Sequence, residues 1–285
     1  MELCQGPRET TRKPNLRVPP LACDCHSHIL GPQSVYPYVS DRSFTAPDAS
    51  AESYLTMLGT LGIERMVIVQ PSVYGSDNRR TASAVVEIGL HRARGVAMVP
   101  SNVDPAELRR LDESGIRATR FIATARGGPT LDELPGVAKA IAPFGWHIEM
   151  YVPPHLWETL LPVVADLPVP VVFDHMGGIP AGSTVDNPLL DGILRLIEKG
   201  RSWVKLTGYR NSLAGHPYDD VLPLARAFVE RVPERCVWGS DWPHTNMPDY
   251  MPDDGDLLDL LADWAPDEAT RHRILVENPA ALYRF

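Results

Sequence analysis

The sequence predicts a single-domain (β/α)8 barrel, and three observations support this fold class. Eight short apolar runs rich in Val and Ile alternate with longer amphipathic stretches along the 285 residues. The runs are more continuous than alternating, as expected of parallel strands that are buried on both faces. A barrel of this kind takes about 250 residues, which fits the chain beyond a short N-terminal arm. An open doubly wound sheet with eight strands is the alternative.

The predicted strands and their connections define the order of the fold. The strands are residues 22–29, 66–70, 95–100, 118–123, 146–152, 169–175, 203–207 and 236–241. Three connections carry both a helix start and a glycine that ends the helix: Asp104-Pro105 with Gly115, Thr130-x-x-Glu133 with Gly145, and Asn187-Pro188 with Gly200. Helical crossovers between strands make the predicted sheet parallel.

Residues 1–21 form a polar arm interrupted by prolines, whose order the sequence leaves open, and residues 22–285 form the predicted barrel. The arm lacks the apolar core of a secretory signal, and no 18-residue apolar run follows, so we expect no membrane span. Cys23 and Cys25 lie on the same side of a predicted strand and are poorly placed to pair. We therefore expect reduced thiols and a cytoplasmic protein.

The formal net charge of −9 argues against nucleic acid or an anionic membrane as a partner. It does not argue against an anionic small molecule, because a local cluster of arginines can override the global charge. The sequence leaves open whether the protein is a monomer or a homo-oligomer.

Candidate catalytic residues stand at the ends of three predicted strands. Asp24, His26 and His28 alternate along the first strand, so we expect them to share one face. His175 ends the sixth strand, and Asp241 ends the eighth. Catalytic groups of a (β/α)8 barrel come from the C-terminal ends of several strands. The pattern therefore predicts that the three histidines and Asp241 meet at one catalytic site.

This pattern resembles the amidohydrolase superfamily, and more closely its branch of 2-pyrone-4,6-dicarboxylate lactonases and related sugar-acid lactone enzymes. The likeness runs from Cys23 to about Tyr283. The matching stretches are residues 24–31, Val69-Gln70, Gly75-x-Asp77-Asn78-Arg79, Gly145-Trp146-His147, Asp174-His175-Met176-Gly177, residues 237–244 and Met251-Pro252-Asp253-Asp254. The segments Asp-His-Met-Gly and Trp-Gly-Ser-Asp-Trp-Pro-His are the most specific of these.

The resemblance implies that the protein hydrolyses a small lactone. Asp241 takes a proton from water, which attacks the ring carbonyl, and Asp241 then returns the proton to the departing oxygen. His175, together with His26 and His28, polarises the carbonyl and stabilises the oxyanion.

The resemblance also implies a set of substrate-binding residues. Guanidinium groups suit carboxylates because they bind them in a bidentate way. The candidates are Arg120, Arg126, Arg210, Tyr151, Ser72 and His244. His244 is expected either to orient Asp241 or to cap its loop. Phe44 and Gly178 stand where the lactonase has a tyrosine and an arginine, so a lactone with fewer carboxylates, such as a muconolactone or an aldonolactone, fits as well as the pyrone dicarboxylate.

Metal-dependent relatives add a lysine or glutamate from the fourth strand, a histidine from the fifth, or both. Here the fourth strand supplies Arg120, and His147 lies roughly 13 Å short of the rim at about 3.3 Å per residue. We therefore predict no metal requirement and no cofactor. The alternative is a zinc ion held by His26, His28 and Asp241.

Two structural expectations concern the surroundings of the site. Residues 31–49, which include Tyr36-Pro37-Tyr38, form a long loop at the rim that we expect to act as a lid or substrate wall. Glu149 lies one layer deeper than Tyr151 and is expected to pair with Lys205 inside the barrel.

Three rival functions are left open. The first is a lactone isomerase that moves an acyl group between hydroxyls. The second is a zinc-dependent decarboxylase or amide hydrolase of the same superfamily. The third is a binding protein that kept the pocket and lost catalysis, which the presence of Asp241 disfavours.

Overall fold

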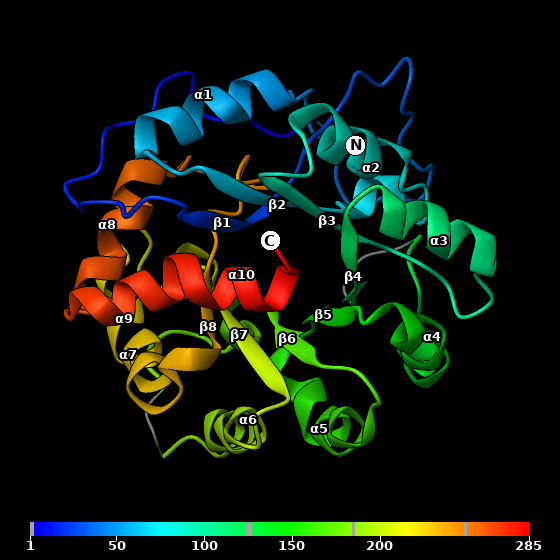
Figure 1. The fold of residues 1–285 in the computed structure, drawn as a ribbon. Helices are drawn as coiled ribbons and strands as arrows, with labels where there is room; N and C mark the ends of the chain where they lie inside the picture. Colours follow the sequence, from blue (N-terminus) through cyan, green and yellow to red (C-terminus); the bar gives the residue numbers. More distant parts are fainter. Residues whose placement is uncertain (1–2, 124–126, 184–185, 248–249) are drawn as a thin grey trace.

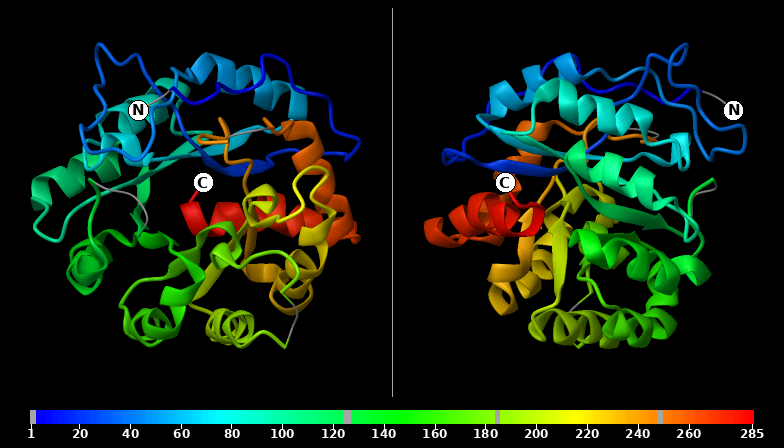
Figure 2. Two further views of the ribbon diagram at one scale, coloured as in Figure 1. Left: turned by 180° about the vertical axis from the view of Figure 1, so that it is seen from behind. Right: turned by 45° about the vertical axis from the view of Figure 1, so that its right-hand side comes forward.

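The computed structural model of the chain is a barrel of eight parallel strands with helices outside it (Figure 1). The structure describes residues 3–123, 127–183, 186–247 and 250–285. The strands are β1 (Cys23–Ser27), β2 (Arg65–Val69), β3 (Ala93–Ala97), β4 (Ile116–Ile122), β5 (His147–Tyr151), β6 (Val171–Phe173), β7 (Ser202–Leu206) and β8 (Cys236–Trp238). The helices are α1 (Ala51–Leu61), α2 (Arg79–Ile88), α3 (Pro105–Glu113), α4 (Leu134–Ile141), α5 (Trp157–Asp166), α6 (Pro188–Glu198), α7 (Leu222–Arg231), α8 (Asp254–Trp264), α9 (Glu268–His272) and α10 (Asn278–Tyr283). Two further views show the same arrangement (Figure 2).

The predicted fold class is confirmed, since the strands pair in chain order from β1 to β8. Between β1 and β8 the barrel closes just beyond the ends of the two strands. The amide of His28 donates to the carbonyl of Trp242 at 2.8 Å, and the amide of Asp241 donates to the carbonyl of His26 at 2.8 Å. The closure therefore lies beside three of the predicted catalytic residues.

Strand β1 departs from the regular strand that the sequence predicts. Its pairing with β2 shifts by one residue between Asp24 and Ser27. As a result the carboxylate of Asp24 accepts a hydrogen bond at 2.9 Å from the hydroxyl of Tyr54 on α1, whereas His26 contacts Lys205 of β7. The prediction that Asp24 shares a face with His26 and His28 is therefore wrong, because a β-bulge turns one side chain to the other side.

The predicted helix starts are confirmed. Asp104 accepts a hydrogen bond from the amide of Ala106 at the start of α3, and Asn187 accepts one from the amide of Leu189 at the start of α6. The capping box of Thr130 and Glu133 is formed and precedes α4. Each cap satisfies backbone donors that a helix start leaves free.

Apolar side chains form one large cluster between the strands and the helices and a smaller one inside the barrel. The inner cluster consists of Cys23, Cys25, Val67, Val69, Val96, Ala118, Val172, Trp203, Val237, Leu282 and Tyr283. Leu282 and Tyr283 belong to α10, which lies across the barrel in Figure 1, and the ring of Tyr283 packs against His147 at the start of β5 with ring centres 5.1 Å apart. Helix α10 therefore closes the barrel at the N-terminal ends of its strands.

The N-terminal arm lies along α8. Arg12 donates from Nε to the carboxylate of Asp256 at 2.8 Å, and the amide of Leu16 donates to Asp259 at 2.8 Å. These contacts join residues that are more than 240 positions apart in the chain.

All four cysteines are free thiols, and the sulfur atoms of Cys23 and Cys25 are 3.8 Å apart, as the sequence predicts for an unpaired couple. Within residues 3–123, 127–183, 186–247 and 250–285, we find no helix with both the length and the apolar character needed to traverse a bilayer.

The variant Tyr283→Phe tests the closure of the barrel by α10. The hydroxyl of Tyr283 donates to Oε1 of Glu149 at 2.7 Å in a buried place. Because the substitution deprives a buried carboxylate of a donor, we expect the free energy of unfolding to fall by about 1.5–3 kcal/mol, measured by urea denaturation. Tyr36→Phe is the control, since its hydroxyl contacts Ser83 at a partly exposed position. Equal losses in both variants would contradict the role of Tyr283.

Candidate active site

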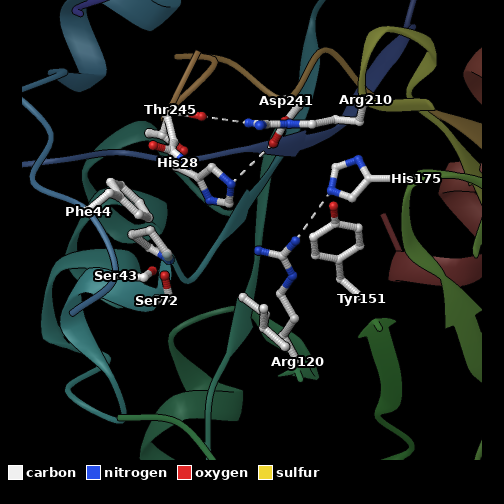
Figure 3. Close-up of a pocket in the computed structure, with 13 residues that line it drawn as sticks. His28, Ser43, Phe44, Ser72, Arg120, Tyr151, His175, Arg210, Asp241 and Thr245 are labelled. Carbon is white, nitrogen blue, oxygen red and sulfur yellow. Dashed lines mark hydrogen bonds and ion pairs between the residues drawn. The ribbon is translucent and has the colours of Figure 1, made fainter. Parts of the chain in front are cut away.

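A cavity of about 220 Å³ lies at the C-terminal ends of the strands (Figure 3). Typical sites for drug-sized ligands measure about 300–1,000 Å³, so this cavity suits a smaller molecule of about one ring. The residues that line it are His28, Ser43, Phe44, Pro71, Ser72, Arg120, Ile122, Tyr151, His175, Arg210, Asp241, Thr245 and Asn246. Ser43 and Phe44 come from the loop of residues 31–49, which therefore forms a wall of the cavity as predicted.

Asp241 follows β8 and is held by contacts on both oxygens. Its Oδ1 lies 3.3 Å from Nε2 of His28 and 3.5 Å from Nε2 of His26. Its Oδ2 accepts a hydrogen bond from Nε of Arg210 at 2.6 Å and another from the hydroxyl of Tyr209. Burial alone would raise the pKa of Asp241, but Arg210 and the histidines outweigh burial and hold it well below its ordinary value. Asp241 is therefore an ionised carboxylate.

The backbone that carries Asp241 is fixed by the carboxylate of Asp24. Oδ1 of Asp24 accepts hydrogen bonds from the amides of His26 and Ser240, at 3.0 and 2.9 Å. Oδ2 accepts from the hydroxyl of Ser240 at 2.6 Å. Asp241 itself has a φ of 64°, in the left-handed region that residues with a side chain rarely adopt. Asp24 thus joins the ends of β1 and β8 beneath the site without lining the cavity.

His28 and His26 lie at different depths. Nδ1 of His28 contacts the carbonyl oxygen of Val69 at 2.8 Å, which directs its Nε2 towards Asp241 at the cavity wall (Figure 3). His26 is fully buried and is not among the residues that line the cavity. Burial, followed by the charge of Lys205, lowers the pKa of His26 well below its ordinary value, so this ring is neutral.

His175 stands in a tight left-handed turn after β6. Its φ and ψ are 49° and 50°, and Met176 continues with φ 51° and ψ 38°. The side-chain amide of Asn211 donates to the carbonyls of His175 at 2.8 Å and Ile179 at 2.7 Å, and so clamps both ends of the turn. Burial lowers the pKa of His175 to about 4, which leaves its imidazole neutral near pH 7. The turn also explains why β6 ends before the predicted boundary.

A cluster of four buried ions lies below the cavity. Arg120 donates from Nε to Oδ2 of Asp174 at 2.9 Å. Lys205 donates to Oε2 of Glu149 at 2.7 Å and lies 3.0 Å from Oδ1 of Asp174. The predicted pairing of Glu149 with Lys205 is therefore confirmed. Nη2 of Arg120 also lies 3.5 Å from Nε2 of His175, which links the ion cluster to the cavity.

The other predicted site residues differ in where they lie. Ser72 and Tyr151 line the cavity, and the Tyr151 ring packs edge-on against His175 with ring centres 4.8 Å apart. His244 is fully buried and is not among the lining residues, and its Nε2 lies 3.0 Å from Asp254. Its amide donates to the carbonyl of Asp241 at 2.9 Å, in keeping with the expectation that His244 orients Asp241 or caps its loop, while a contact of His244 with substrate stays a prediction. Arg126 lies outside the described residues.

Sequence reasoning missed Asp174, Tyr209 and Asn211 as parts of the site. Asp174 is adjacent to His175 in the Asp-His-Met-Gly segment, and a carboxylate directly after the apolar run that ends at Phe173 was the available signal. Tyr209 and Asn211 flank Arg210 in the short turn after β7. Nothing in their spacing shows that one bonds to Asp241 and the other to the turn at His175.

The spacing of three groups suits zinc, but the hydrogen bonding of one of them does not. With metal bonds of about 2.0–2.1 Å, neighbouring ligands of tetrahedral zinc lie about 3.3 Å apart, close to the separations of Asp241 from His26 and His28 given above. A metal-bound imidazole nitrogen must be free of a proton. Nδ1 of His26 faces the ammonium of Lys205 at 3.0 Å, which leaves the proton of the neutral ring on Nε2. The groups as arranged therefore do not fit a zinc ion.

The fold and the site together define an enzyme of the (β/α)8-barrel hydrolase class, with a carboxylate and histidines at the C-terminal rim. The chain belongs to the amidohydrolase family, whose sequence pattern matches residues 23–285. The resemblance inferred from the sequence motifs is thereby confirmed.

Individual relatives act on lactones according to their names. The 4-sulfomuconolactone hydrolase of Rhizobium radiobacter is 41% identical, over 98% of this chain and 95% of the relative. The 2-pyrone-4,6-dicarboxylate hydrolase of Comamonas testosteroni is 36% identical, over 95% and 92%. The D-galactarolactone isomerase of Agrobacterium fabrum is 32% identical, over 95% and 94%. An apo crystal structure from Agrobacterium tumefaciens, 32% identical, superposes with a TM-score of 0.86 over 95% of this chain and 98% of that one.

The variant Asn211→Ala tests whether the turn at His175 is held for function. The loss of two donors to buried carbonyls should lower the free energy of unfolding by about 1–3 kcal/mol, and it should reduce turnover because His175 loses its position. Asn187→Ala is the matched control, because the side chain of Asn187 also accepts or donates several hydrogen bonds but caps α6 outside the cavity. We expect the control to lose about 0.5–2 kcal/mol of stability and no activity. Full turnover by Asn211→Ala, measured below its melting range, would contradict the assignment.

Proposed function

We propose that this protein is a lactonase that hydrolyses a small acidic lactone without a bound metal ion. The observation that carries the proposal is the contact of ionised Asp241 with Nε2 of His28 at the wall of a cavity that also holds Arg120 and Arg210. A base and cationic groups thus meet at one cavity of the size of a single ring.

The reaction begins when Oδ1 of Asp241 accepts a proton from a water molecule. The resulting hydroxide forms a bond to the lactone carbonyl carbon, and the tetrahedral intermediate carries the negative charge on the former carbonyl oxygen. The ring C–O bond then breaks, and the departing oxygen receives the proton that Asp241 holds. Water is consumed, and one hydroxy acid is formed.

His175 is the group that we assign to the stabilisation of the oxyanion, whereas His28 contacts the base through Nε2. Nε2 of His175 faces the guanidinium of Arg120, which can only donate, so the neutral ring carries its proton on Nδ1. Among the described residues this Nδ1 has no hydrogen-bond partner; it is buried, and a small turn of the ring would bring its proton to the oxyanion. Preorganised donors of this kind stabilise developing negative charge more in a water-poor site than in water.

Arg210 ties substrate binding to the strength of the base. In the structure its Nε holds Oδ2 of Asp241, which keeps the pKa of Asp241 low and the carboxylate a weak base. An acidic group of the substrate that shares Arg210 would weaken this hold and raise the pKa of Asp241 towards the range that general base catalysis needs. The substrate would thus activate the base by binding.

The cavity lining limits the number of acidic groups on the substrate. Phe44 and Ile122 contribute apolar surface, and Phe44 lies across the cavity from His175 and Tyr151 (Figure 3). Gly178 is not among the lining residues, and a side chain there would meet the carbonyl of Val152 at 3.1 Å. A muconolactone or aldonolactone with one or two acidic groups therefore suits the cavity as well as a pyrone dicarboxylate does.

A cytoplasmic location also belongs to the proposal. It is supported by the free state of the four cysteines, three of which are buried. A net charge of −9 disfavours nucleic acid as a partner and suits an enzyme of small molecules.

A lactone panel tests the proposed function. The purified protein is assayed with muconolactones, aldonolactones, a pyrone dicarboxylate and a neutral lactone of similar ring size, and the products are identified by NMR. We expect ring-opened acids, and a kcat/KM at least about tenfold higher for acidic lactones, since charge-assisted hydrogen bonds contribute about 1.5–3 kcal/mol. A rearranged lactone as product would instead establish the isomerase alternative, and no turnover of any lactone would refute the proposal.

The variant Asp241→Asn tests the base. The amide has nearly the same shape but cannot accept the proton, so we expect kcat to fall by about 10²–10⁴-fold with the fold retained, as judged by circular dichroism. Asp220→Asn is the control, because this carboxylate is hydrogen-bonded in the loop near Ser212 and does not line the cavity. Turnover by Asp241→Asn at the rate of the control would end the assignment of Asp241 as base.

A further inference from the structure

Lys205 is a fully buried side chain whose ammonium group faces three polar atoms, two of them as hydrogen-bond partners and one as an ion pair. Its Nζ lies 2.7 Å from Oε2 of Glu149, 3.0 Å from Oδ1 of Asp174 and 3.0 Å from Nδ1 of His26. Burial alone would lower the pKa of Lys205, but the two carboxylates outweigh it and raise that pKa above its ordinary value. The group is therefore an ammonium ion that can donate and cannot accept.

The contact with this ammonium ion fixes the protons of His26. Nδ1 must offer its lone pair to Lys205, so the single proton of the neutral ring resides on Nε2. The only carboxylate oxygen near Nδ1 among the described residues is Oδ1 of Asp174, at 3.7 Å, which is too far to accept a hydrogen bond from that nitrogen. The opposite tautomer would place an N–H of His26 against an N–H of Lys205.

The proton on Nε2 of His26 lies on the side of Asp241. Nε2 is 3.5 Å from Oδ1 of Asp241. Among the described residues this nitrogen has no hydrogen-bond partner. A short shift of either group completes a hydrogen bond to the oxygen that acts as the base. The same proton blocks the lone pair through which His26 would bind a metal.

We infer that Lys205 is a positioning residue that holds His26 as a donor through Nε2, which orients Asp241 and withdraws His26 from metal ligation. The second ring nitrogen of a metal-binding histidine usually donates a hydrogen bond from its N–H to a carboxylate or a carbonyl, as Nδ1 of His28 is able to do with the carbonyl of Val69. At His26 the direction of the hydrogen bond is reversed, because Lys205 donates to Nδ1 and Nδ1 accepts. The effect of Lys205 on turnover rests on the proposed lactone hydrolysis, whereas its effect on the tautomer of His26 does not.

The first experiment determines the tautomer of His26 in the wild-type protein. Long-range ¹H–¹⁵N NMR spectra of the ¹⁵N-labelled chain distinguish protonated from unprotonated ring nitrogens, and the signals of His26 are those that disappear in His26→Gln. We expect Nε2 to be protonated and Nδ1 to be unprotonated. A proton on Nδ1 with a bare Nε2 would overturn the inference, whatever the enzyme does with lactones.

The second experiment removes the donor with Lys205→Met. We expect a proton to appear on Nδ1 of His26 and the affinity for zinc, measured by competition with a chromophoric chelator, to rise by about 10–100-fold. The kcat for lactone hydrolysis should fall by at least about tenfold with KM changed by less than about threefold, because Lys205 orients a base and does not touch substrate. An unchanged tautomer in a folded Lys205→Met would overturn the inference.

Two further variants separate this role from a general disturbance of the ion cluster. Glu149→Gln alters the same cluster but leaves Lys205 beside His26, so its His26 should keep the proton on Nε2; a change of tautomer like that of Lys205→Met would count against Lys205. If Lys205→Met does not fold, Lys205→Met/Glu149→Gln removes one charge of each sign and takes its place. A wild-type chain that hydrolyses no lactone refutes the proposed function, while its NMR spectrum still decides the tautomer.

Discussion

The buried ion cluster below the cavity is the constraint on which the rest of the site depends. Lys205 and Arg120 supply two positive charges, and Glu149 and Asp174 supply two negative charges, in a region that is almost closed to solvent. Breaking one pair of such a cluster leaves an uncompensated buried charge and costs about 3–5 kcal/mol. The four side chains therefore form a fixed set of charges beneath the cavity. Side chains that contact this cluster have to match the hydrogen-bond donors and acceptors that it presents, and His26, which contacts Lys205, is the clearest case.

The charged groups lie in two layers, one below the cavity and one at its wall, and the two layers have different roles. The lower layer is balanced in charge and paired within itself, so it orients its neighbours, and of its four members only Arg120 lines the cavity. The upper layer pairs Asp241 with Arg210, whose side chain retains 20% exposure while that of Asp241 retains 2%. An anionic ligand can therefore reach the cation of the upper pair and compete for it with the carboxylate. The chemistry that we propose uses this competition, because the ligand itself removes the charge that keeps the base weak.

The sequence alone predicted the fold and the members of the site better than their roles. Continuous apolar runs mark strands buried on both faces, and the ends of such strands must meet at one rim, which places His28, His175 and Asp241 together. The bulge in β1 has no sequence mark, so the direction of Asp24 could not be foreseen. The partner of His244 could not be foreseen for a related reason, since Asp254 comes from the start of a helix whose position depends on the whole fold. Ion pairs between strands, such as Arg120 with Asp174, likewise cannot be predicted until the register of the strands in the barrel is known.

Backbone strain connects the hidden polar groups to the chemistry at the rim. His175 and Asp241 both have a positive φ, of 49° and 64°, and a residue with a side chain held in such a region costs about 1–3 kcal/mol. The hydrogen bonds of Asn211 hold the first turn, and those that Asp24 accepts hold the second. Both clamps are buried, where satisfied polar groups are least able to exchange with water. Asp24 lines no part of the cavity, yet by this argument it supports the position of the base.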